Sequence, residues 1–352
     1  EIKLTITKKF IFFFILVFGL ISIFFIIDYC YTNYFRAPSS EIDYRVPHKV
    51  YHHNLGVSFN GFDVWGHKKY KVCTDMNGFR SSCDKINVSN KQFDVAFIGD
   101  SMTEGIGLLH ENTFVGMFAA NHPKLKVANL GVASYNSTIY LTKIKWLLHN
   151  GFSFKHIYVF IDISDIQDES RYSINSNGVV ISEDQTVKPD SLLYPLKEFV
   201  FKNFKLFYVG FGNLKRLIEP LTAKKQNLED YSPKLSTEAL PVRFPIGFWQ
   251  RSEWTYNSNS TAYGTLGVDG SIKQAEKNMT ELHKILNIWG ISLSVGVYPW
   301  PTQLIEIKDS NNKINRQVSI WKKFCEKRCS NFINLFPKYK DLIAKNGLEY
   351  TY

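Results

Sequence analysis

The sequence has no internal repeat and no low-complexity tract in its 352 residues, which excludes a repeat array. It also has no basic run and no nucleic-acid-binding motif, although its net charge is +10. Because the lysines and arginines are dispersed, we expect no nucleic-acid partner, and a polyanion of the wall or membrane fits this charge better. The hydrophobic content of 45% is enough for a sizeable core, in one large domain or two ordinary ones.

Cysteine is scarce, with five residues in the chain. Cys73 and Cys83 flank a turn that contains glycine, and Cys325 and Cys329 are four residues apart on a predicted helix. Both pairs are possible disulfides in an oxidising compartment. Buried free thiols remain the alternative for each pair, because a single sequence does not give the connectivity. Cys30 is left over at the expected membrane edge.

Long apolar runs are also few, and residues 10–27 form the one that could nearly cross a bilayer as a helix. Lysines precede this run and aromatic residues follow it, which favours a cytoplasmic segment 1–9 and an extracytoplasmic remainder. Asp28-Tyr29-Cys30-Tyr31 offers no small-x-small cleavage site, so we predict a retained anchor rather than a cleaved signal peptide. The expected location is the inner (plasma) membrane, with a single pass and a periplasmic domain.

Residues 28–92 alternate in short runs separated by turn residues, which predicts a linker and a small β-rich preface. The adjacent histidines His52 and His53 lie within it. Side chains of neighbouring strand residues point to opposite faces, so one ion would rarely bind both. We therefore interpret the two histidines as structural.

From residue 93 to 352 the pattern alternates between strands and helices, which predicts an α/β fold with a parallel, flavodoxin-like sheet between two helical layers. We expect strands at 94–98, 126–130, 157–161, 293–297 and 332–335, and helices at 113–121, 139–149, 272–289 and 315–327. A large insertion of about 100 residues, near 166–268, interrupts this pattern and is longer than an ordinary crossover. Within it, 192–218 reads as an amphipathic helix that could rest on a membrane, hold an acyl chain or simply pack in a core. A following aromatic stretch, 244–256, could be a lid or a sugar-stacking surface.

The apolar run from Phe93 to Ile98 ends at Gly99-Asp100-Ser101, which would place a hydroxyl at the carboxyl edge of the sheet, where ligands bind. The stretch 97–105, Phe-Ile-Gly-Asp-Ser-Met-Thr-Glu-Gly, resembles the first block of the SGNH or GDSL hydrolases. That resemblance implies a nucleophilic Ser101 supported by Gly99 and Asp100. Ser101 and Glu104 also have the spacing of a capping box, so an ordinary helix start remains a compatible alternative.

A second segment, 129–136, resembles the next block of the same family. Its first glycine is Gly131, and Ser134 stands where the family usually has an oxyanion-hole glycine. The resemblance implies that the backbone N–H groups of Ser101 and Ser134 bind the oxyanion, because only a backbone donor is needed there. A strand-to-helix turn with Asn136 or Ser137 as the N-cap is the structural alternative.

The third block, 160–169, departs from the family pattern, because Ser164 replaces the asparagine that donates to the oxyanion. The implied oxyanion hole is therefore Ser101, Ser134 and Ser164, with Gly131 and Asp165 in support. A hydroxyl reaches less far than an amide, and losing such a donor can cost about 3 to 4 kcal/mol. We interpret the carboxylates at 162, 165, 168 and 169 as solvated loop charges and caps, and we predict no metal and no cofactor.

The histidine and aspartate of a catalytic triad are missing, because no Asp-x-x-His occurs in the 352 residues. The family has this block just beyond the point that corresponds to Pro337. Because the first residue, Glu1, is also not methionine, we expect the sequence to be a fragment, with the base following Tyr352.

The first hypothesis is a membrane-anchored serine esterase or O-acyl (acetyl) transferase that acts on ester groups, with envelope polysaccharide as the substrate by analogy. It would work through an acyl intermediate on Ser101. The second hypothesis is a catalytically silent scaffold or polysaccharide-binding module. It is favoured by the change at Ser164 and by the absent histidine.

Overall fold

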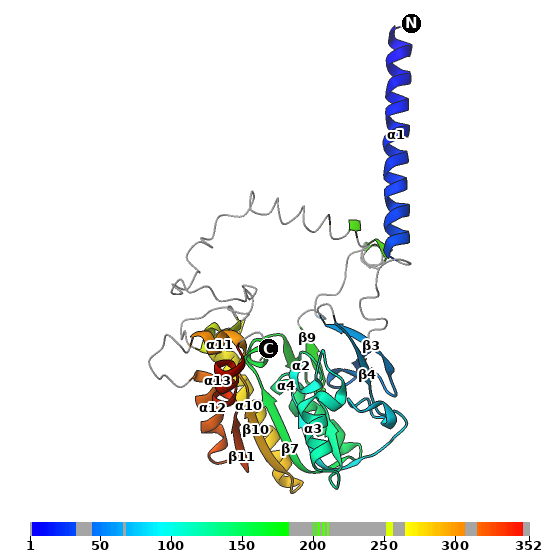
Figure 1. Cartoon of the computed structure of the whole chain (residues 1–352). Coiled ribbons are helices and arrows are strands. Elements are labelled where there is room, and N and C mark those ends of the chain that lie inside the picture. Colours follow the sequence, from blue (N-terminus) through cyan, green and yellow to red (C-terminus); the bar gives the residue numbers. More distant parts are fainter. Residues whose placement is uncertain are drawn as a thin grey trace. The chain divides into compact units, whose positions relative to one another are not determined.

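The computed structural model describes residues 2–32, 44–65, 68–182, 200, 203–204, 206–207, 210, 251–255, 265–306 and 315–347. The chain divides into two compact units, 1–38 with 187–239 and 39–186 with 240–352 (Figure 1). Each unit is treated separately below.

The first unit contains α1 (Ile2–Cys30), one long helix that includes the predicted span 10–27 (Figure 1). Its segment Lys8–Cys30 has a mean hydropathy of 3.2 and is long and apolar enough to cross a membrane. Near its end, the Asp28 carboxylate accepts hydrogen bonds from the backbone N–H groups of Leu206 (2.9 Å) and Phe207 (2.8 Å). Residues 203, 206 and 207 are helical, but Phe204 is not. The prediction of one continuous helix over 192–218 is therefore wrong at Phe204, and most of that range lies outside the described residues.

The second unit is built on a five-stranded parallel sheet, as the alternating pattern predicts. Its strands are β5 (Gln92–Ile98), β6 (Val127–Asn129), β7 (Ser153–Ile161), β10 (Ser292–Val297) and β11 (Asn331–Asn334). The spatial order is β11-β10-β7-β5-β6, so β7 is the central strand and β5 lies beside it. Figure 1 shows β7, β10 and β11 next to one another. All five predicted strands are confirmed within a few residues at their ends.

The four predicted helices are also confirmed, as α3 (Phe114–Asn121), α4 (Ser137–His149), α10 (Gly267–Ile288) and α12 (Arg316–Cys325). Residues alternate along β5 between two hydrophobic clusters, because successive strand side chains point to opposite faces. Ala96 and Ile98 belong to the large cluster that includes α4 and α10, whereas Val95 and Phe97 belong to a smaller cluster that includes α3. Both faces of β5 are therefore buried.

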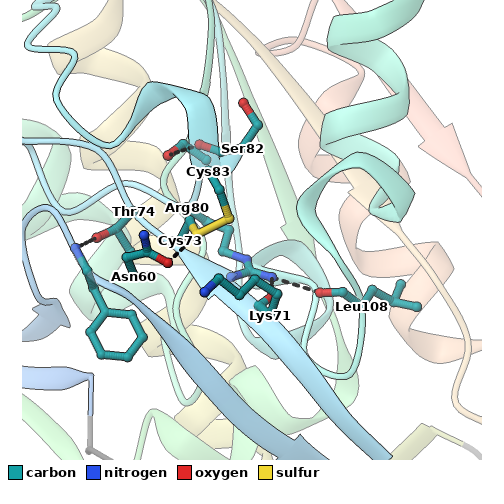
Figure 2. The surroundings of a disulfide bond; sticks show 10 residues. Asn60, Lys71, Cys73, Thr74, Arg80, Ser82, Cys83 and Leu108 are labelled. Atoms are coloured by element: carbon teal, nitrogen blue, oxygen red, sulfur yellow. Dashed lines mark hydrogen bonds between the residues drawn. A yellow bond between two sulfur atoms is a disulfide. The ribbon is translucent and has the colours of Figure 1, made fainter.

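The preface consists of two antiparallel hairpins, which confirms its β-rich character. They are β1 (Arg45–His48) with β2 (His52–Leu55), and β3 (Asn60–Trp65) with β4 (Lys68–Cys73). The buried Arg80 links the second hairpin to the loop that contains Leu108, because its Nη2 donates to the carbonyls of Lys71 (3.1 Å) and Leu108 (2.7 Å) (Figure 2).

Both cysteine pairs form disulfides in the structure, Cys73 with Cys83 and Cys325 with Cys329. The first ties the end of β4 to the 3-10 turn η2 (Cys83–Lys85), beside Arg80 (Figure 2). Cys30 is the free cysteine in the part of the chain that the structure covers.

Much of the predicted insertion lies outside the described residues. Its two described ends belong to the second unit: α5 (Ile163–Asp168) and the hairpin β8 (Tyr172–Ile174) with β9 (Val180–Ser182) at one end, and η5 (Glu253–Thr255) at the other. Trp254 is fully buried, and its indole N–H donates to the Ile163 carbonyl at 3.3 Å. Trp254 is thus a core residue and not part of an exposed aromatic surface. Two further helices among the described residues are α11 (Pro301–Glu306) and α13 (Phe336–Asn346).

Candidate active site

The predicted nucleophile Ser101 is the first residue of α2 (Ser101–Glu104), directly after the carboxyl end of β5. Gly99 allows this turn, because a Cβ there would lie 2.8 Å from the Phe160 carbonyl oxygen on the neighbouring strand β7. Asp100 is the N-cap of α2, and its Oδ1 accepts from the backbone N–H of Met102. The alternative of a Ser101–Glu104 capping box is therefore wrong, because the cap is Asp100.

The Asp100 carboxyl group connects Ser101 to Tyr298, which follows another strand of the sheet. The Ser101 hydroxyl donates to Asp100 Oδ2 at 3.1 Å, and the Tyr298 hydroxyl donates to Asp100 Oδ1 at 2.7 Å. Tyr298 follows the end of β10, so residues from two strands meet at this carboxyl group. Burial and the nearby Asp162 raise the pKa of Asp100 well above its usual range, which favours a protonated carboxyl group.

Asp162 and Asp165, after the end of β7, complete a buried acidic cluster with Asp100. Each of the three residues offers a carboxylate oxygen within 4.8 Å of the others. Asp162 is the N-cap of α5, and its Oδ2 accepts from the Trp300 indole N–H at 2.8 Å. The Tyr140 hydroxyl donates to Asp165 Oδ2 at 2.7 Å, while Asp165 Oδ1 has no partner among the described residues.

This cluster corrects the interpretation of these carboxylates as solvated loop charges. Asp162 and Asp165 are 1% and 2% exposed, and Asp168 and Glu169 are also buried. The interpretation of Asp162 as a cap is confirmed. Burial and the charge of Asp162 raise the pKa of Asp165 as well, so protons can relieve the repulsion within the cluster. Among the described residues, the carboxylate oxygens of Asp100, Asp162 and Asp165 are the group that could bind a hard cation.

The second loop of the resemblance, between β6 and α4, is attached directly to the nucleophile turn. The Val132 N–H donates to the Gly99 carbonyl at 3.2 Å, and the Ala133 N–H donates to Glu104 Oε2 at 2.7 Å. Gly131 allows this contact, because a Cβ there would lie 2.6 Å from the Glu104 backbone nitrogen. Residues 131–133 therefore pack against α2 itself.

Ser134 has a φ of +63°, the left-handed conformation that favours glycine. The serine thus holds a backbone conformation that glycine would adopt without strain. Asn136 caps α4 by accepting from the Ile139 N–H, which confirms the structural alternative for this turn. The two interpretations of the loop are compatible, because they concern different residues.

Ser164 lies in the first turn of α5, and its hydroxyl is occupied. Its Oγ donates to Asp162 Oδ1 at 2.6 Å, and its backbone N–H donates to the same oxygen. In this state the Ser164 hydroxyl hydrogen does not face an oxyanion. The structure thus brings Ser101, Asp100 and Asp165 to one sheet edge, with Ser134 on the adjoining loop.

The histidines His52 and His53 contact each other, contrary to the expectation that they point to opposite faces. Their Nδ1 atoms are 2.8 Å apart. The reason is that His52 has a φ of +73°, which turns its side chain away from the regular strand alternation. His53 Nε2 lies 2.8 Å from the Ala133 carbonyl oxygen, in the second loop.

No catalytic base is in contact with the nucleophile in the described part of the chain. The hydrogen bond of the Ser101 hydroxyl is to Asp100, and no described histidine nitrogen is bonded to it. Burial lowers the pKa of His48, His53 and His110 to about 4.

No family model matches the sequence, and no curated protein matches it. The interpretation of the site therefore depends on its geometry and on the motif resemblance.

Sequence reasoning missed several residues of this site, chiefly Tyr298, Trp300, Tyr140, Glu104 and His53. Tyr298 and Trp300 follow directly after a predicted strand, so their position at the carboxyl edge was the available signal. The contacts of Glu104 and His53 had no such signal, because they depend on a loop 29 and 80 residues further along the chain.

Proposed function

We propose that this protein is a membrane-anchored serine esterase or O-acyltransferase that works through an acyl intermediate on Ser101. The observation that carries the proposal is the joint position of Ser101 after β5 and of the Ser134 loop hydrogen-bonded to the same turn. If the five strands of the sheet are numbered along the chain, their spatial order is 2-1-3-4-5, which supports a flavodoxin-like arrangement. Ligands in such sheets bind at the switch point, where the strand order reverses, and Ser101 follows the first strand at this point.

In the proposed reaction, Ser101 Oγ attacks the ester carbonyl carbon and the oxygen of that carbonyl becomes an oxyanion. Backbone N–H groups of Ser101 and Ser134 would stabilise this charge. The ester C–O bond then breaks, the alcohol leaves, and water or a sugar hydroxyl takes the acyl group. The serine proton needs an acceptor, a role that the resemblance assigns to an Asp-x-x-His histidine rather than to any described residue.

The proposed location follows from α1 and the two disulfides. A helix that can cross a membrane, with lysines before it, favours a cytoplasmic N-terminus. Disulfides persist in oxidising compartments, which supports an extracytoplasmic second unit. Esters of envelope polysaccharide are the proposed substrate class, because such a unit would face the envelope; the substrate is an analogy.

A catalytically silent scaffold or polysaccharide-binding module is the second candidate. The observations that favour it are the Ser101 hydrogen bond to a buried carboxyl group and the occupied hydroxyl of Ser164. Without a base, a triad enzyme loses turnover by about a million-fold.

Covalent labelling separates the two candidates. The native membrane protein is treated with a fluorophosphonate probe, and the labelled peptide is identified by mass spectrometry. We expect labelling at Ser101 that disappears in Ser101→Ala and persists in Ser173→Ala, which removes an exposed hydroxyl on β8. No labelling of the native protein, or equal labelling of Ser101→Ala, would favour the binding module.

A further inference from the structure

The peptide unit between Ala133 and Ser134 is held from several directions. The Ala133 carbonyl and the Ser134 N–H belong to one planar unit, so a group that fixes the carbonyl also fixes the direction of the N–H. That N–H is the second oxyanion donor of the proposed function. The contacts of the Ala133 carbonyl therefore bear directly on the donor.

His53 approaches this unit from the preface. Its Nε2 lies 2.8 Å from the Ala133 oxygen, and because a carbonyl only accepts, Nε2 must carry the hydrogen. In the neutral form of His53, its Nδ1 is an acceptor and faces His52 Nδ1 at 2.8 Å, so that His52 donates from Nδ1.

Burial supports the neutral form of His53, since it lowers the pKa of His53 to about 4. The hydrogen bond to the Ala133 carbonyl raises this pKa and only partly offsets burial, while His52, Lys143 and Arg45 lower it. The Tyr135 hydroxyl donates to the His53 backbone carbonyl at 2.7 Å, which connects the histidine to the same loop a second time.

Glu104 holds the other side of residue 133. Its Oε2 accepts the Ala133 N–H at 2.7 Å. Its Oε1 accepts from the Tyr44 hydroxyl at 2.6 Å and from Arg45 Nη2 at 2.7 Å, and Glu104 is 1% exposed. Both backbone polar groups of Ala133 are thus bonded to side chains that are themselves fixed.

This arrangement explains how Ser134 keeps a left-handed conformation that is strained for a non-glycine residue, because surrounding contacts must maintain such strain. We propose that His53 and Glu104 are positioning residues that fix the Ala133–Ser134 peptide and so orient the Ser134 N–H toward the oxyanion. The inference depends on the proposed function. The His53 hydrogen bond also polarises the peptide, which strengthens its N–H as a donor.

The test compares His53→Gln with His53→Asn in the native membrane protein. Glutamine can place its amide N–H near the Nε2 position, whereas asparagine is one methylene too short. The substrate is p-nitrophenyl acetate and the covalent probe is a fluorophosphonate. We expect His53→Asn to lower kcat and the labelling rate about 10-fold or more. This loss should be smaller than the loss of about 100-fold or more that follows when an oxyanion donor is deleted, because the Ser134 N–H is still present. His53→Gln should stay within about 3-fold of the native rate, and KM should change little, because the oxyanion forms only in the transition state.

His156→Asn is the matched control. His156 is half-buried on β7, its ring stacks on Tyr158, and its hydrogen bond among the described residues is to the Ser294 hydroxyl (2.8 Å) rather than to the loop. Its substitution should leave kcat unchanged. Equal rates for His53→Asn and His53→Gln, whether both native or both slow, would overturn the positioning role. An unlabelled native protein would instead refute the proposed function, and it needs no His53 variant to be seen.

Discussion

The hydroxyl of Tyr298 donates a 2.7 Å hydrogen bond to Oδ1 of Asp100, 198 residues earlier in the chain. Both residues are buried. The bond connects the end of β10 to the N-cap of α2, although β7 lies between β10 and β5. The position of Ser101 therefore depends on a residue two strands away in the sheet.

Tyr298→Phe removes only this hydroxyl. We expect the free energy of unfolding to fall by about 1 to 3 kcal/mol, because a buried carboxyl group loses a donor. The pKa of Asp100 should rise further, since the tyrosine hydrogen bond lowers it. The measurement is the urea midpoint of the detergent-solubilised protein.

Tyr158→Phe is the control for this change. Tyr158 lies on β7, and its ring stacks on Phe97 at 5.1 Å, but no hydrogen bond of its hydroxyl is found among the described residues. Its substitution should leave the midpoint within experimental error. A Tyr298→Phe variant that is equally unaffected would show that the Asp100 contact adds nothing to stability.

The fold was predictable from the sequence to a large extent. Strand-length apolar runs and helical periodicity are local signals, and they located all five strands of the sheet and the four helices that were predicted. The turn at Gly99-Asp100-Ser101 was located for the same reason, since it is contiguous with β5.

The rest of the site was not predictable because its contacts are long-range or depend on backbone conformation. Nothing local shows that Asp162 and Asp165 are buried, since both follow a strand and could equally lie in a solvated loop. The His52–His53 contact depends on the positive φ of His52, whereas strand alternation predicts opposite faces. Glu104 looked like half of a capping box until the Ala133 loop was placed beside it.

Replacing both Cys73 and Cys83 with alanine should lower the free energy of unfolding by about 2 to 3 kcal/mol, the entropic effect of opening a loop this long. The bond closes a separation of 10 residues, whereas Cys325–Cys329 closes only 4, so alanine at the second pair should cost less, about 2 kcal/mol. Urea midpoints under oxidising conditions measure both. The reverse order would show that local strain or packing, not loop length, decides the effect.

Ser134→Gly should keep fluorophosphonate labelling within about 3-fold of the native rate, because the proposed donor is the backbone N–H. Glycine also adopts the φ of +63° without strain. Ser134→Val should slow labelling and destabilise the protein by about 1 to 3 kcal/mol, since a β-branched residue is strained there.

Ser58→Val is the control, because Ser58 also has a positive φ, +49°, but lies in the preface. It should destabilise the protein without slowing the labelling of the folded fraction. If Ser58→Val and Ser134→Val slow labelling equally, the effect at Ser134 is one of stability alone and not of the donor.

Lys143 on α4 is fully buried, and its ammonium donates to Asn54 Oδ1, the Leu130 carbonyl and the Tyr135 hydroxyl. Burial lowers the pKa of Lys143 to about 7. Between this value and its ordinary pKa of about 10.5, the unfolded chain binds the extra proton, so the contribution of Lys143 to stability must rise with pH. The contribution of Lys143 to this slope is at most about 1.4 kcal/mol per pH unit.

Lys143→Met should remove this rise, and Lys145→Met, at an exposed position on the same helix, should keep it. The measurement is the free energy of unfolding of each variant between pH 7.5 and 9.5, below the range where unfolded tyrosines ionise at about pH 10. Burial raises the pKa of Tyr135, which would reverse the trend at higher pH. Parallel curves for native and Lys143→Met proteins would mean that Lys143 keeps an ordinary pKa in the folded state, with its three acceptors compensating for its burial.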